Sequence, residues 1–227
     1  MPRSRLGDNV DRIRDAAISV FADRGYRRTR MADIAAAAGL SPGALYRYVE
    51  SKDALLLLIF SAEAAPTSTF PVATPTRAQL VSTITERLST LGQTPRLDAA
   101  LKRRRPPVDA GHELRDILEE RYDLVARAWP LLAVVERSSL DLPELFDAYF
   151  HRGRRHLTDK IARYLERRAK SGSLRAVADA RLSARFLEES LTWFAWHRHG
   201  DPDSQDISES AARTTAIDTN FCALMVP

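Results

Sequence analysis

The amino-acid sequence predicts an all-α protein with two domains. Apolar residues recur at spacings of three and four along almost the whole chain, and the alternating apolar and polar runs typical of strands are absent. Prolines and glycines divide the chain into segments of helical length. With 227 residues, the chain is long enough to bury a sizeable core.

The first predicted helices lie before residue 40. The first has one apolar face and is expected to end at Gly25 as a left-handed cap; the face holds Val10, Ile13, Ala17, Val20 and Phe21. Thr29 is expected to cap a second helix, which Gly39 ends. The apolar face of this second helix consists of Met31, Ile34, Ala35 and Ala38.

A third, short helix is predicted over residues 42–48. Ser41 is a good N-cap, Pro42 suits the first helical position, and Leu40 is placed to pack onto Leu45. Val49 is the only other residue expected in the core. Helix, tight turn and helix form the unit that presents its second helix to the major groove of duplex DNA.

The short third helix carries more large side chains than a core could use. Gly43 and Ala44 leave room for close approach to base edges, and Tyr46, Arg47 and Tyr48 follow them. Tyrosine hydroxyls and an arginine fork suit phosphate oxygens and guanine edges. The alternative is a plain solvated face, for which two tyrosines beside an arginine are a poor choice.

A fourth helix is predicted from the Ser51 cap through Phe60 towards Ala64, with Lys52 in its first turn. The helix dipole disfavours a cation there, whereas a phosphate at that helix end would make it favourable. We therefore expect Lys52 to bind a DNA phosphate. The alternative is a tolerated surface lysine.

Residues 66–75 hold three prolines and are expected to form a loop. We expect a DNA-binding domain over residues 1–55 and a larger helical domain over residues 56–227. Further helices are predicted at residues 76–91, 97–104, 112–128, 130–139, 142–170, 179–199 and 206–224, with a break at Trp129 and Pro130.

Residues 8–60 resemble, without a gap, the DNA-binding domain of TetR-type transcriptional regulators. The resemblance rests on the spacing of Ile34 and Ala35, residues 38–41, Gly43, residues 45–48, and Ser51 with Lys52. Val49 departs from it, because relatives usually carry phenylalanine there. The resemblance implies a homodimer with a helical ligand-receiving domain. It also implies backbone contacts from Thr29, Arg30, Tyr46 and Lys52, base contacts from Pro42, Gly43, Ala44 and Arg47, and either role for Tyr48.

In such proteins two late helices pair across the dimer, and residues 142–170 and 179–199 are the candidates here. Their apolar side chains predict an interface made of Phe150, Leu157, Ile161, Phe186, Trp193 and Phe194, with an intramolecular core as the alternative. A ligand pocket is expected among residues 76–139, roofed by residues 142–170. Its candidate lining is Tyr122, Trp129, Leu132 and Phe146, while Phe146 and Trp193 could belong to either site. Residues 147–174 also resemble the C-terminal region of AefR-like members.

Several other classes of function are disfavoured. No apolar stretch is long enough for a membrane span or a signal peptide, and a single cysteine allows no internal disulfide, so we expect a cytoplasmic protein. No arrangement of catalytic residues stands out, and neither an enzyme nor a cofactor is expected. His197 and His199 cannot share a helix face, so no metal site is expected. The basic run Lys102–Arg105 is expected to be a solvated helix end.

The sequence therefore predicts a regulator, most simply a repressor, that binds a palindromic operator in double-stranded DNA as a dimer. A small, apolar inducer would bind the second domain, shift the fourth helix and release the DNA. The alternative is an activator, or a constitutive DNA-binding regulator without a ligand.

Overall fold

The computed structural model describes residues 5–61 and 70–226, with the side chains of residues 5–7 left aside. Within these ranges the chain is helical and has no strand; a single parallel bridge joins Val49 and Val72. The all-α prediction is confirmed. None of the described helices is long and apolar enough to cross a membrane.

The chain divides into two compact units, which are described separately. The first comprises residues 1–91 and 130–152, and the second comprises residues 92–129 and 153–227. The domain boundary predicted after residue 55 stays a prediction, because these units are divided by packing and not by function.

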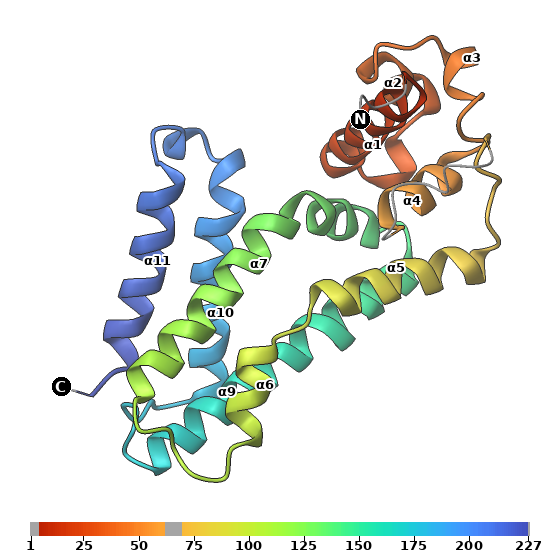
Figure 1. Cartoon of the computed structure of the whole chain (residues 1–227). Helices are drawn as coiled ribbons and strands as arrows, with labels where there is room; N and C mark the ends of the chain where they lie inside the picture. The colour runs from red at the N-terminus through yellow and green to blue at the C-terminus, as the bar shows by residue number, and fades with distance from the viewer. Residues whose placement is uncertain (1–4, 62–69, 227) are drawn as a thin grey trace. The chain divides into compact units, whose positions relative to one another are not determined.

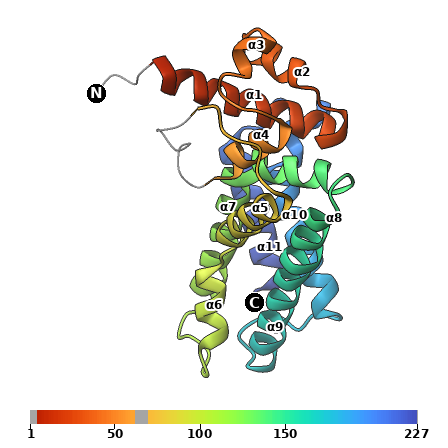
Figure 2. The ribbon, with the colours of Figure 1, turned by 90° about the vertical axis from the view of Figure 1, so that its right-hand side faces the viewer.

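The first unit holds the predicted helix-turn-helix. It contains α1 (Arg5–Arg28), α2 (Met31–Ala37), α3 (Pro42–Leu45), α4 (Lys52–Phe60), α5 (Arg77–Leu91), α8 (Pro143–Phe146) and the end of α7. The helices α2 and α3 lie on one side of α1 (Figures 1 and 2). One apolar cluster joins α1, α2, α3 and α4, and its fully buried side chains include Ile13, Phe21, Ile34, Leu45 and Phe60.

Gly25 occupies a backbone conformation that is almost restricted to glycine, with φ 75° and ψ 174°. Its positive φ was predicted, but helical turns resume after it and α1 continues to Arg28. A Cβ at this position would lie 3.0 Å from the carbonyl oxygen of Arg137. Arg137 Nε also donates to the carbonyl of Asp23 (3.1 Å), and the Arg27 amide donates to Asp141 Oδ2 (2.8 Å). The end of α1 is therefore fixed on the end of α7, and glycine permits this approach.

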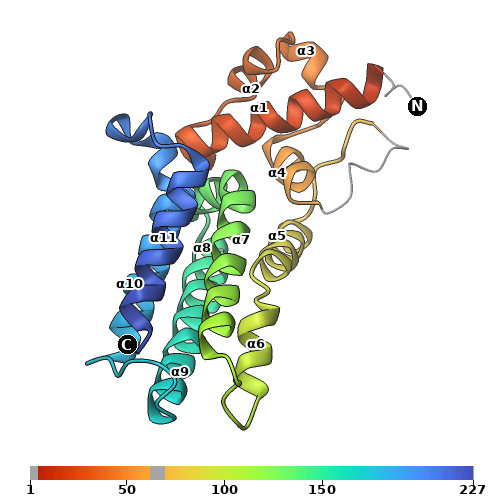
Figure 3. The same ribbon diagram turned by 60° about the vertical axis from the view of Figure 1, so that its left-hand side comes forward.

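The second unit is a helical bundle. It contains α6 (Pro95–Lys102), the first part of α7 (Ala110–Ser139), α9 (His156–Lys170), α10 (Ala180–Ala195) and α11 (Glu209–Leu224). In Figure 3, α10 and α11 run side by side. Two ion pairs tie α11 to α7: Arg213 with Asp123 (2.8 Å) and Arg115 with Asp218 (2.8 Å).

The predicted break at Trp129 and Pro130 is wrong, because α7 continues through Pro130. A proline removes one backbone donor and crowds the carbonyl four residues earlier, which bends helices as well as ending them. Buried residues stand on both sides of it, with Val125 and Ala128 before and Val134 and Val135 after. The free energy gained by burying apolar side chains on both sides of Pro130 outweighs the loss of one backbone hydrogen bond.

Two other predicted helices differ in detail. The segment 142–170 is α8, then a π-helix over Asp147–Arg155, then α9. The helix predicted over 179–199 ends at Ala195, and a 3₁₀ turn covers His197–Gly200. Arg198 Nε donates to the Phe194 carbonyl (2.6 Å) and so satisfies an acceptor at the end of α10. Helix α4 ends at Phe60, while Ala64 and residues 66–69 lie outside the described residues.

Candidate nucleic-acid interface

The turn between α2 and α3 forms by the local signals that the sequence predicts. Gly39 has φ 66°, and the Ser41 hydroxyl accepts a hydrogen bond from the Ala44 amide (3.2 Å). Pro42 occupies the first position of α3. Leu45 is fully buried, and Leu40 packs at the edge of the same apolar cluster. The result is a tight turn whose two flanking helices are both packed against the apolar cluster.

Arg12 of α1 supports this turn, and the sequence did not indicate it. Its guanidinium donates to the carbonyl of Ala38, the last buried residue before the turn. A Cβ on Gly39 would lie 2.7 Å from Arg12 Nη2. Glycine is therefore needed here for its positive φ, whereas the flexible end of Arg12 could move away from an added Cβ.

The third helix is shorter than predicted. Regular α-helix covers only Pro42–Leu45, and turns continue to Tyr48. The amides of Tyr46 and Val49 donate to the carbonyls of Pro42 (3.2 Å) and Leu45 (3.2 Å), so the chain still winds to residue 49. Val49 is fully buried, as predicted. Val49 forms a parallel bridge with Val72, so the helix does not continue beyond this residue.

One face of this segment is open. Pro42, Gly43 and Arg47 are exposed, Ala44 is half-buried, and the Tyr46 side chain is 49% exposed. A Cβ on Gly43 would meet nothing within 4 Å. Residues 42–47, which we call the reading segment, thus share an accessible surface. Small residues lie at its start and large polar residues at its end.

Tyr48 lies differently from its two neighbours. It is half-buried, its hydroxyl accepts a hydrogen bond from Asn9 Nδ2 (3.0 Å), and its ring packs edge-on against Phe70 (5.7 Å between centroids). These contacts join α1 and the chain after α4 to the end of the reading segment. Tyr48 is therefore held by residues from two other parts of the chain, and neither Asn9 nor Phe70 was singled out from the sequence.

Lys52 begins α4 and has a partner within the protein. Its ammonium donates to the Tyr26 carbonyl (2.9 Å) and lies 4.5 Å from the centre of the Tyr26 ring. The Tyr26 hydroxyl donates in turn to Asp53 (2.6 Å), and the Ser51 hydroxyl accepts from the Ala54 amide (3.2 Å), which confirms the predicted cap. A cation at this helix start is thus compensated by a carbonyl and a ring face, before any phosphate is considered. An ammonium has three donors, so this carbonyl does not use them all.

The predicted cap of α2 is wrong. Arg30 is the N-cap residue, and its amide donates to Asp33 Oδ2 (2.9 Å). Thr29 is 1% exposed, and its hydroxyl donates to the Gly25 carbonyl (2.7 Å), because the unusual backbone at Gly25 turns that carbonyl towards it. Arg30 is exposed. Of these two predicted DNA contacts, Arg30 offers a side chain to solvent and Thr29 does not.

These features define a helix-turn-helix DNA-binding domain: two helices joined by a tight turn, with an exposed tyrosine and arginine on the second. Residues 13–59 match the family described as bacterial regulatory proteins, tetR family. The helix-turn-helix segment of this chain belongs to that family, and the resemblance found in the sequence is confirmed.

Solved structures share the fold over nearly the whole chain. PfmR, a TetR family transcriptional regulator from Thermus thermophilus, is 23% identical with a TM-score of 0.53, covering 93% of this chain and 98% of that chain. The SmeT–triclosan complex is 22% identical with a TM-score of 0.53, covering 96% and 92%. AibR in complex with isovaleryl coenzyme A and operator DNA is 16% identical with a TM-score of 0.54, covering 94% and 98%. No curated protein matches the sequence.

The four predicted pocket residues are divided between the two units. Tyr122 and Trp129 lie in the second unit, and Leu132 and Phe146 lie in the first. Tyr122 is buried and its hydroxyl donates to Glu209 (2.9 Å); burial, and then this carboxylate, raise the pKa of Tyr122 to about 12. None of the four lines the small cavity that the second unit contains. Their role in a pocket stays a prediction.

Two of the predicted pocket residues, Trp129 and Phe146, make ring contacts. Trp129 stacks on His199 with 5.2 Å between ring centres. Phe146 is 39% exposed and packs on Phe150 (4.8 Å) and His151 (5.4 Å). Among the described residues, no three His, Cys, Asp or Glu side chains gather in a way that could hold a metal ion.

The six predicted interface residues fall into three groups by exposure. Leu157 and Ile161 are buried within the second unit and offer no surface to a partner. Phe186 is 70% exposed on α10, and Leu182, one turn earlier, is 69% exposed. The remaining three are half-buried: Phe150, Trp193 and Phe194. Leu182 belongs to the same apolar stripe in the sequence, although it is not among the six predicted interface residues.

Proposed function

We propose that the chain is a transcriptional regulator that binds duplex DNA as a homodimer and represses transcription until a small molecule releases it. The observation that carries the proposal is the exposed Tyr46 and Arg47 pair at the end of the reading segment. Among the described residues neither side chain has a hydrogen-bond or ion-pair partner of its own, while Tyr48 beside them is fixed by Asn9 and Phe70.

The proposed division of contacts follows exposure. Arg47 reads a base edge, because an arginine fork matches the two acceptors of guanine in the major groove. Pro42, Gly43 and Ala44 allow the backbone to approach the bases. Tyr46, Arg30 and Lys52 contact phosphates, which orient the protein without reading sequence. Thr29 and Tyr48 act by holding the segment in place.

The proposed dimer places α10 of each copy against its counterpart. The exposed Leu182 and Phe186 supply the apolar centre, and half-buried Trp193 lies further along the same helix. A two-fold axis brings the same patch from both copies together, as an isologous contact requires. One recognition segment reads few bases, so a dimer is also needed for specificity.

Response to a small molecule is supported by two proteins of the same fold. SmeT has been solved with triclosan and AibR with isovaleryl coenzyme A and operator DNA. In this chain the ligand would favour a state that does not bind DNA, which is the condition for release. In this proposal the protein is not an enzyme. It works in the cytoplasm, whose reducing conditions agree with a sequence that holds one cysteine and so forms no internal disulfide. A reporter gene placed behind the operator separates repression from activation, because a repressor lowers its output.

Replacing Lys52 by alanine tests the phosphate contacts. We expect weaker operator binding and a slope of log affinity against log salt that is shallower by about one for each lysine lost. The slope is the informative quantity, because loss of the Tyr26 contact alone would change affinity without releasing fewer counterions. The melting temperature of the free variant measures that structural loss. An unchanged salt slope would contradict the phosphate contact.

A further inference from the structure

The Lys52 ammonium lies between the ends of two helices. It belongs to the first turn of α4, where the helix dipole disfavours a cation, and it donates to the carbonyl of Tyr26 in the last turn of α1 (2.9 Å). The last carbonyls of a helix have no partner within it, and a cation is favourable there. Helix α4 packs against α1 (Figure 3). The end of α1 therefore offsets the unfavourable position of this lysine in α4.

The aromatic ring of Tyr26 lies beneath this ammonium. The Lys52 nitrogen is 4.5 Å from the ring centre, a distance at which the face of a ring attracts a cation. Among the described residues Lys52 makes no ion pair, and the Tyr26 carbonyl uses one of its three N–H donors. Tyr26 therefore fixes where the positive charge lies and leaves two donors for a group outside the protein.

The Tyr26 ring is itself held by two contacts. Its hydroxyl donates to Asp53 (2.6 Å), and its ring stacks on the fully buried Phe21 with 6.2 Å between ring centres and 12° between ring planes. Burial, and then Asp53, raise the pKa of Tyr26 well above its ordinary value, so the hydroxyl keeps its proton and continues to donate. The ring face offered to Lys52 is thus fixed within the protein, without any help from DNA.

Asp53 does not neutralise Lys52, although it follows it directly in the chain. Consecutive residues of a helix do not face each other, and within the described part of the chain no ion pair joins these two. The Asp53 carboxylate accepts from Tyr26 and also lies close enough to Arg77 of α5 for their charges to attract. A DNA phosphate would therefore meet no described carboxylate that competes with it for the ammonium.

We propose that Tyr26 is a positioning residue for DNA binding, because its ring holds the Lys52 ammonium where a backbone phosphate of the operator meets it. This inference rests on the proposed function, in which Lys52 contacts a phosphate. A free lysine side chain loses rotamer freedom when it binds a partner, whereas a side chain that is already held loses less. Tyr26 thus strengthens the phosphate contact by acting through Lys52.

Two variants of Tyr26 separate the ring from the hydroxyl, since the backbone carbonyl stays in both. Tyr26→Leu removes the ring, and a dimer that loses two such cation–ring contacts should bind the operator about ten-fold more weakly. Tyr26→Phe keeps the ring and should bind within about two-fold of the native chain. Both variants lose the hydrogen bond to Asp53, so both should melt at a lower temperature. Affinity should therefore follow the ring, whereas stability follows the hydroxyl.

A double-mutant cycle with Lys52→Ala supplies a readout that a merely structural role would not change. The full chain and its variants are titrated against a labelled duplex recovered by selection from random DNA. In the Lys52→Ala background, Tyr26→Leu should lower the affinity no further. On its own, Tyr26→Leu should leave the slope of log affinity against log salt unchanged, because Lys52 still reaches its phosphate. Tyr26→Met, which fills the same space without a ring, takes the place of Tyr26→Leu if that variant does not fold.

The proposal is overturned if Tyr26→Leu binds the operator as tightly as the native chain or more tightly, if Tyr26→Phe loses as much affinity as Tyr26→Leu, or if the losses from Tyr26→Leu and Lys52→Ala add. The same titrations show separately whether the proposed function fails. If the native chain selects no duplex, or if Lys52→Ala keeps the native affinity and salt slope, the phosphate contact is absent and positioning by Tyr26 is wrong with it. If Lys52→Ala binds more weakly and Tyr26→Leu does not, only the role of Tyr26 is wrong.

Discussion

Replacing Arg47 by alanine is expected to lower operator affinity by at least an order of magnitude while leaving the fold intact. A bidentate arginine–guanine contact contributes about 1–3 kcal/mol to discrimination against the wrong base, and a dimer loses two such contacts. Arg47 is exposed and makes no hydrogen bond or ion pair among the described residues, so its loss costs the folded protein little. Titration of labelled operator by the native and variant proteins measures the effect.

The matched control for Arg47 is Arg104→Ala. Arg104 is an exposed arginine in the basic run Lys102–Arg105, which we expect to be solvated. Its removal changes net charge by the same amount but should leave operator affinity and base preference nearly unchanged. Equal losses from both variants would mean that Arg47 acts only through general charge. A loss confined to Arg47, with relaxed preference at one base of each half-site, supports its role as a reader.

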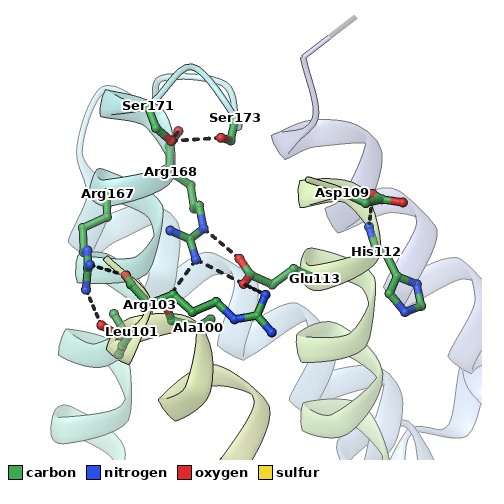
Figure 4. A network of polar contacts seen from close by, with 10 residues as sticks. All are labelled: Ala100, Leu101, Arg103, Asp109, His112, Glu113, Arg167, Arg168, Ser171 and Ser173. Carbon is green, nitrogen blue, oxygen red and sulfur yellow. Dashed lines mark hydrogen bonds and ion pairs between the residues drawn. The ribbon is translucent and has the colours of Figure 1, made fainter. Parts of the chain in front are cut away.

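Replacing Arg168 by methionine is expected to destabilise the protein by about 3 kcal/mol. Its partner Glu113 has a side chain only 10% exposed, so removal of the arginine leaves a nearly buried carboxylate, a change that typically costs about 3–5 kcal/mol. Arg103 lies 3.7 Å from Glu113 and retains part of the compensation, which favours the lower end of that range. The bonds from Arg168 to Glu113 and to the Ala100 carbonyl join α9 to α7 and α6 (Figure 4).

Denaturant unfolding of the native chain and the Arg168→Met variant measures this effect. The control is Arg115→Met, because Arg115 and its partner Asp218 are 40% and 48% exposed. Exposed pairs contribute about 0–1 kcal/mol, so the control should unfold close to the native chain. If both variants lost a similar free energy of unfolding, burial of the Arg168 ion pair would contribute nothing to stability.

Local chemistry explains what the sequence could predict of the fold and the site. Gly39, Ser41 and Pro42 act within a few residues of themselves, so their conformations were predictable, and the turn between α2 and α3 follows from them. The apolar spacing likewise predicted α5 and α11 closely. The exposed positions of Tyr46 and Arg47 were predictable because Leu45 and Val49 already satisfy the small core beneath them.

Contacts between distant residues explain what the sequence could not predict. The sequence predicts Thr29 as the N-cap of α2, but its hydroxyl donates to the Gly25 carbonyl instead. Tyr48 stays a predicted DNA contact, but its contacts with Asn9 and Phe70 could not be predicted, because both partners lie far along the chain. Leu157 and Ile161 form an apolar stripe that fits either an interface or a core, and only the placement of α6 and α7 decides for the core. For Tyr48, Leu157 and Ile161 the deciding partner lies far along the chain, where no spacing rule applies.

The central claim is that two copies of this chain read DNA together through the segment from Pro42 to Arg47. Selection of bound fragments from random duplex DNA by the full chain tests it most directly. The proposed function predicts a palindromic consensus whose half-sites lie about one duplex turn, roughly 34 Å, or a multiple of it apart. A consensus with a single unrepeated half-site, or no enrichment above the input DNA, would contradict the claim.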